Sequence, residues 1–158
     1  ILTDGTVPLA DYAFYAATMR SVTVGTGATE VGVRAFGGCN NLREVSLPAG
    51  ITAVREHAFS ECTALEAVTL PEGVTELGVN AFLGCTALET VTLPQTLGRL
   101  PSGVFLGCRR LKDIDLGGVR TVGSNAFRGC GALETVRAAG DVTFSEGNET
   151  AEKLVGRV

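Results

Sequence analysis

The sequence has little of what catalysis usually requires. It contains one histidine, His57, whereas a general base or a metal ligand needs several polar side chains that converge on one point. It contains neither a GxxxxGK[ST] phosphate loop nor a GxSxG turn that would carry a nucleophilic serine. We therefore expect no enzyme and no cofactor, and we expect His57 to point to solvent.

Basic residues and long apolar runs are also scarce. The 158 residues include 13 Lys and Arg against 17 Asp and Glu, which gives a net charge of −4, and the basic residues are scattered. Nucleic-acid binding depends on clustered Lys and Arg, so we expect none. No apolar run approaches the roughly 18 residues that a membrane-spanning helix needs. We therefore expect no direct insertion into a membrane.

Five cysteines are present, and they are evenly spaced. The intervals are 23, 23, 23 and 22 residues, at Cys39, Cys62, Cys85, Cys108 and Cys130. Zinc sites instead use CxxC pairs that bring four ligands to one point, and a disulfide framework uses an even number of cysteines. We therefore expect no metal site, and we interpret the cysteines as small buried hydrophobic residues.

Other apolar residues follow the same period. A Phe lies three residues before each of these cysteines, and a Leu lies three residues after it. A fixed period of about 20–50 residues indicates a stack of similar units, because a single unit cannot bury its own apolar face. We predict one repeat domain over 1–158, with partial units at both ends, and we expect it to be a piece of a longer protein. The full units of 22–23 residues are 10–31, 32–54, 55–77, 78–100, 101–122 and 123–144.

Each unit contains two local patterns. The stretch 65–70 ends in alternating apolar and polar residues, which predicts a short strand with one buried face, and Pro71 ends it because proline has no N–H. The equivalent stretches are 42–47, 88–93 and 111–116. The apolar residues of 54–65 have near-helical spacing over only two turns. We expect an α/β-type solenoid with a parallel sheet on one face and short helices or 3₁₀ turns on the other.

The stretch 65–88 reads LEAVTLPEGVTELGVNAFLGCTAL. It resembles the BspA-like (Treponema-type) class of leucine-rich repeats, whose pattern is LxxIxLPxxLxxIgxxAFxxCxxL. The resemblance covers about residues 9–144 and implies a right-handed coil. The first unit departs from the pattern, because Ala16 stands in place of Cys and Met19 in place of Leu; in the fifth, Val104 stands in place of Ala.

The outward positions of the predicted strands form the candidate binding surface. This face has small polar and charged side chains and no aromatic residue, whereas binding hot spots favour Trp, Tyr and Arg. It is either a solvated sheet face or a flat platform for a protein or a glycan. Charge varies most in the C-terminal half. The candidate residues are Arg43, Glu44, Ser46, Glu66, Thr69, Glu89, Thr90, Thr92, Lys112, Asp113, Asp115, Thr135 and Arg137.

Two classes of function remain open. The resemblance implies a non-catalytic recognition or adhesion module that is secreted or exposed on a cell surface, as in the surface proteins of bacteria and protists that carry such repeats. The alternative is an intracellular scaffold or a structural subunit of a larger assembly. In that case a neighbouring domain or subunit would cover the repeat ends, near Leu2 and Val158.

The last residues carry two further signals. Asn148-Glu149-Thr150 is a glycosylation sequon, which marks a surface loop if the chain is secreted. Val155 and Val158 match Leu133 and Val136 at an offset of 22 residues, which predicts a last partial strand.

Overall fold

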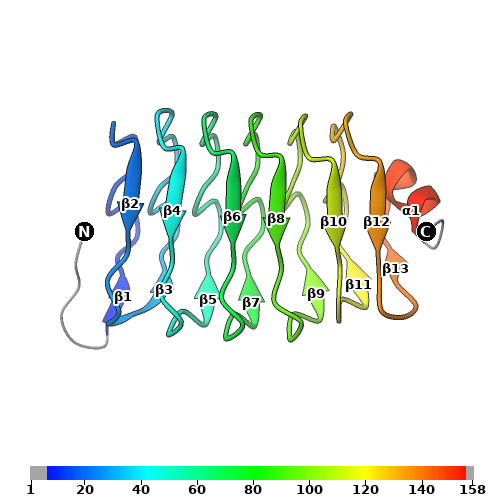
Figure 1. Ribbon diagram of the computed structural model, residues 1–158, viewed down its shortest axis with the longest axis horizontal. Helices are drawn as coiled ribbons and strands as arrows, with labels where there is room; N and C mark the ends of the chain where they lie inside the picture. Colours follow the sequence, from blue (N-terminus) through cyan, green and yellow to red (C-terminus); the bar gives the residue numbers. More distant parts are fainter. Residues whose placement is uncertain (1–6, 156–158) are drawn as a thin grey trace.

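The computed structural model describes residues 7–155, and these residues form a rod of stacked coils (Figure 1). Each coil contributes one strand to each of two parallel rows that run along the rod. The coil period, the parallel pairing and the solenoid architecture are therefore confirmed. Among the described residues there is little helix, and no helix is long and apolar enough to cross a bilayer.

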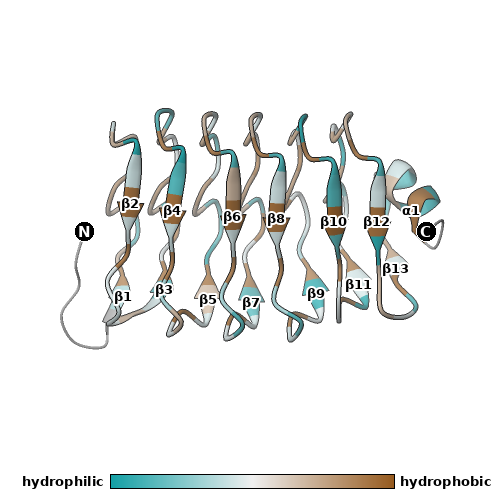
Figure 2. Cartoon of the chain, viewed as in Figure 1, coloured by the Kyte–Doolittle hydropathy of each residue, from teal (hydrophilic) through white to brown (hydrophobic). Residues whose placement is uncertain are grey.

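The first row, which we call row A, contains the predicted strands. Each strand is three residues long, and its middle residue points inward while its neighbours point outward. In Figure 2 these middle residues form a hydrophobic band across the row. Row A consists of β2 (Ser21–Thr23), β4 (Glu44–Ser46), β6 (Ala67–Thr69), β8 (Thr90–Thr92), β10 (Asp113–Asp115) and β12 (Thr135–Arg137).

A second row, row B, lies at the end of each repeat unit and was not predicted as strand. Its members are mostly two residues long, too short for alternation in the sequence to reveal them. Row B consists of β1 (Val7–Leu9), β3 (Ala28–Val31), β5 (Ala53–Val54), β7 (Glu76–Leu77), β9 (Arg99–Leu100), β11 (Thr121–Val122) and β13 (Thr143–Phe144).

The expected helices or 3₁₀ turns on the remaining side are not confirmed. The described residues there form successive turns, in which Ser60 N–H donates to His57 O at 3.1 Å. The intervening amides donate to the next coil instead, as Phe59 N–H does to Ala81 O at 2.8 Å. The backbone φ is +55° at His57 and +59° at Glu61. A left-handed residue every four positions interrupts any helix, because helical residues need negative φ.

Phenylalanine rings stack along the centre of the rod. The rings of Phe59 and Phe82 are 5.3 Å apart and nearly parallel, and those of Phe82 and Phe105 are 5.8 Å apart. All three side chains are fully buried. The column begins at Phe14, which is partly buried against the core and stacks on Phe36 at 5.6 Å.

The cysteines form a second buried column, which confirms their interpretation as core residues. Each thiol donates to the carbonyl of the Phe in the preceding coil, as Cys85 Sγ does to Phe59 O at 3.1 Å. Burial raises the pKa of the Cys85 thiol to about 12, so the reactive thiolate is scarce at neutral pH. The other four thiols make the same contact at 3.1–3.2 Å.

A different structure closes the C-terminal end of the described chain. Helix α1 (Glu149–Leu154) packs Ala151 against the last full coil, and Val155 then pairs in parallel with Val136. The expected match of Val155 to Leu133 is therefore wrong, because the helix changes the offset. Leu2 and Val158 lie outside the described residues.

Asn148, which precedes α1, is only 2% exposed. Its Oδ1 accepts from Phe127 N–H at 3.0 Å, and its Nδ2 donates to Gly123 O at 2.9 Å and Ser145 O at 2.8 Å. In the preceding coil, Phe105 N–H donates to the backbone carbonyl of Ala126. The Asn148 side chain thus replaces the backbone of a further coil. A glycan would be attached to this Nδ2 nitrogen, so the sequon does not mark a surface position in the folded chain.

We expect Phe82→Ala to lower the free energy of unfolding by about 3–5 kcal/mol, because it leaves a cavity between two stacked rings. Thr92→Ala is the matched control, since Thr92 lies on an exposed position of row A. Urea denaturation of both variants measures the difference. Equal stability of the two variants would contradict the stacked core.

Asn148→Ala should cost about 1–3 kcal/mol for each buried group that loses its partner. The amide of Phe127 should also exchange with solvent faster, because it loses its acceptor. Asn41→Ala, at an exposed position, is the control. The capping role would be excluded if Asn148→Ala left both the stability and the Phe127 exchange rate unchanged.

Candidate functional site

The outward side chains of row A form columns, as the repeat predicted. Thr69 lies beside Thr92, and Asp113 lies beside both Thr90 and Thr135. All thirteen candidate residues therefore lie on one side of the rod, and all except the half-buried Thr135 are exposed. The described residues contain no ion pair among these thirteen.

The structure does not distribute these residues evenly over a flat surface. A groove of about 750 Å³ lies between β4 and β6, in the N-terminal half rather than in the C-terminal half where charge varies most. Five candidates border it: Arg43, Glu44, Ser46, Glu66 and Thr69. The other eight, from Glu89 to Arg137, lie on the same row beyond β6.

The groove lies where the hydrogen bonding of row A is interrupted. Row A is paired in two blocks, β2–β4 and β6–β8–β10–β12, with no ladder between β4 and β6. Three equivalents of Leu47 (Val24, Leu70 and Leu116) donate across the row, as Leu70 N–H does to Thr92 O at 2.9 Å, whereas no such bond is made by Leu93. In the described part of the chain, the Leu47 amide has no such acceptor. A ligand in the groove can therefore reach a free backbone donor.

The groove has an apolar floor and a charged rim. Val45 and Leu47 are only partly buried, whereas their counterparts Val68 and Leu70 are 3% and 2% exposed. Three carboxylates (Glu44, Glu66, Glu72) and one guanidinium (Arg43) surround this floor. Sequence reasoning missed the floor, because Val45 and Val68 are the same residue type at the same repeat position.

His57 is not directed to solvent as expected. It is half-buried, its Nε2 lies 3.4 Å from Asn80 Nδ2, and its buried Nδ1 has no hydrogen-bond partner. Burial is the main cause that lowers the His57 pKa below its ordinary value, and the nearby Arg34 guanidinium lowers it further, while Glu56 opposes them. In the fifth coil the residue equivalent to His57, two before the Phe, is Gly103, which also has a positive φ.

The parallel coils, the Phe column and the strand-and-turn unit define a leucine-rich repeat solenoid. The chain belongs to the BspA type leucine rich repeat family, whose model matches residues 8–146 in six copies. The predicted family is therefore confirmed. No curated protein matches the chain significantly.

Solved structures agree with this assignment. A leucine-rich repeat protein of Treponema pallidum is 30% identical, with a TM-score of 0.62 over 80% of this chain and 71% of that one. One from Eubacterium ventriosum is 27% identical, with a TM-score of 0.71 over 77% of this chain and 33% of that one. The pneumococcal vaccine antigen PcpA shares the fold at 21% identity and a TM-score of 0.68, over 84% of this chain and 36% of its own. The matches indicate no enzyme family.

His57→Asn should reduce the dependence of stability on pH. Because the folded-state pKa lies below the ordinary value of about 6.5, the neutral ring stabilises the fold above that pH. This contribution is lost as the pH falls below about 6.5 and through the folded-state pKa. Asn tolerates the same positive φ, as Asn80 and Asn125 do in other coils.

The measurement is the melting temperature at pH 7 and pH 5 for both proteins. The melting temperature of the wild type should fall more between pH 7 and pH 5 than that of His57→Asn. An identical fall in melting temperature for both proteins would mean that protonation of the His57 ring does not destabilise the fold.

Proposed function

We propose that this chain is a non-catalytic protein-binding module that engages its partner through row A, centred on the groove between β4 and β6. The observation that carries the proposal is the interrupted ladder, which combines an apolar floor, an unpaired backbone donor and a charged rim in one place. Ligand sites in proteins are usually concave and mainly apolar, with a few polar groups that fix orientation.

A protein partner fits this surface better than a glycan does. The described part of row A contributes no aromatic side chain on which a sugar ring could stack. The groove instead offers the half-buried side chains of Val45 and Leu47 to an apolar side chain of a partner. The remaining candidates, from Glu89 to Arg137, would form the polar rim of a larger interface.

We further propose that the protein is secreted or displayed on a cell surface. The resemblance to BspA-like surface proteins supports this location. The alternative is a scaffold inside a larger assembly. It is supported by two exposed tyrosines at the N-terminal end of the described chain, since Tyr12 and Tyr15 are 54% and 51% exposed. Exposed tyrosines of this kind are typical of interfaces. Fractionation of the native host with an antibody to this chain separates the two locations.

The groove can be tested by capture of the native partner with the full chain as bait. Ser46→Arg and Thr69→Arg place bulky charged side chains at its border, on exposed positions that do not contribute to the core. We expect each to reduce the recovered partner at least about tenfold, equivalent to about 1.4 kcal/mol. Thr92→Arg is the matched comparison and should reduce capture less, because Thr92 lies beside Thr69 but at the rim, outside the groove.

Three outcomes would contradict parts of the proposal. Loss of capture with Thr92→Arg alone would place binding elsewhere on row A. Capture that survives all three substitutions would exclude the row as the contact surface. Capture that is abolished when the partner is treated with a glycosidase, but not when it is unfolded, would identify a glycan.

A further inference from the structure

Row B is interrupted at one place in the described chain, between β7 and β9. In four other coils, the residue after the strand donates its N–H to the preceding coil. Gly78 N–H donates to Val54 O at 2.7 Å, and Gly123 N–H donates to Leu100 O at 2.8 Å. Pro101 occupies this position in the fifth coil and has no N–H to donate. Within the described residues, the carbonyl of Leu77 therefore receives no hydrogen bond.

The charges beside this interruption are not balanced locally. Arg55 bonds Glu30 at 2.7 Å and Glu76 at 2.9 Å. Glu76 is thereby engaged on the β5 side, away from Arg99. On its other side Arg99 lies beside Thr121, which is uncharged. The exposed guanidinium of Arg99 therefore has no ion-pair partner in the described part of the chain.

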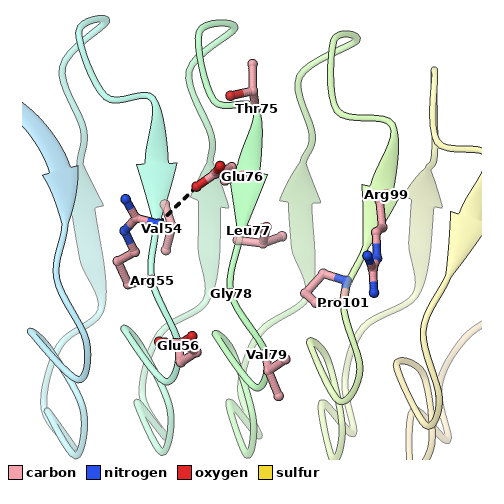
Figure 3. A pocket seen from close by; sticks show the side chains of 10 residues that line it. All are labelled: Val54, Arg55, Glu56, Thr75, Glu76, Leu77, Gly78, Val79, Arg99 and Pro101. Carbon is pink, nitrogen blue, oxygen red and sulfur yellow. Dashed lines mark hydrogen bonds and ion pairs between the residues drawn. The ribbon is translucent and has the colours of Figure 1, made fainter.

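A hollow of about 350 Å³ lies over the interruption, and Figure 3 shows its lining. Arg55 and Glu76 are bonded on one side of Leu77, and Arg99 lies on the other side, near Pro101. Val79 adds an apolar side chain that is 42% exposed. Glu56 and Glu76 also line the hollow, on the side away from Arg99, so a ligand that is acidic only at its Arg99 end avoids repulsion by these carboxylates.

We propose that this hollow, the β7/β9 site, binds an extended segment of a partner polypeptide that carries an acidic side chain. A backbone N–H of the segment donates to the free Leu77 carbonyl in place of the missing Pro101 N–H. A carboxylate of the segment pairs with Arg99, and an apolar neighbour covers Val79. An extended chain suits this arrangement because main-chain hydrogen bonds give affinity and alternate side chains give specificity. The site lies on row B and does not depend on the groove of row A.

The test uses the ¹⁵N-labelled full chain at low ionic strength, where charge pairing is least screened. Two acetylated and amidated peptides serve as probes, Gly-Ser-Val-Glu-Val-Ser-Gly and the same peptide with Gln in place of Glu. We expect amide shifts at residues 75–79 and 98–100, and about fivefold tighter binding of the Glu peptide. Shifts that are confined to row A, or no shift with either peptide, would overturn the proposal.

Two substitutions test separately the contribution of the Arg99 charge and that of the unpaired Leu77 carbonyl. Arg99→Gln should bring the two peptides to equal affinity, whereas Arg109→Gln, at an exposed turn position outside both hollows, should change nothing. Pro101→Gly introduces the residue found at Gly78 and Gly123 and restores the N–H. Pro101→Gly should weaken the binding of both peptides and should give a new amide at position 101 that is protected from hydrogen exchange. A protected amide at position 101 with unchanged peptide binding would overturn the role of the Leu77 carbonyl.

Discussion

The whole structure depends on hydrogen bonds that the backbone of one coil makes with the next. Along the turn side, alternate amides donate forward, as Phe36 N–H does to Ala58 O and Phe59 N–H to Ala81 O, both at 2.8 Å. The left-handed residues that flank each Phe, such as His57 and Glu61, also donate forward, and their positive φ excludes a helix. No coil can satisfy its own backbone groups, so each requires another coil or a substitute. The Asn148 side chain is such a substitute.

The same dependence determines where the surface can bind. A solenoid with complete ladders offers only outward side chains. The described chain departs from this at two places, between β4 and β6 in row A and between β7 and β9 in row B. At each place a hollow lies over backbone groups without partners. The two proposed sites are therefore consequences of interruptions in one repeated interaction, and Pro101 is the residue that causes the second.

Much of the fold could be predicted because identical residues recur in register. The Phe and Cys columns need no more than the count between Cys39 and Cys130. The predicted short helices or 3₁₀ turns are not confirmed. The spacing of Val54, Ala58 and Cys62 is nearly helical, but His57 and Glu61 have positive φ, for which those residue types give no strong signal. Row B was missed because two residues show no alternation.

The candidate site was less predictable than the fold. The repeat places the outward residues of row A correctly in columns, but it treats all coils alike. The groove arises from a difference between coils, since Val45 is partly buried where Val68 is fully packed. The interruption of row B could have been predicted from Pro101, because the other coils have a residue with an N–H at this position. Asn148 could not be predicted in the same way, because its sequon suggests a glycosylation site whereas its side chain caps the last coil.

Native-state hydrogen exchange of the interior coils tests the central claim most directly. The amides of Phe59 and Phe82 donate only to the neighbouring coil, at 2.8 and 3.0 Å. If coils stabilise one another, both amides should exchange only through global unfolding, with a free energy equal to that from denaturant titration. Exchange of either amide at a much lower free energy, with the rest of the rod intact, would show that coils open independently and would contradict the account.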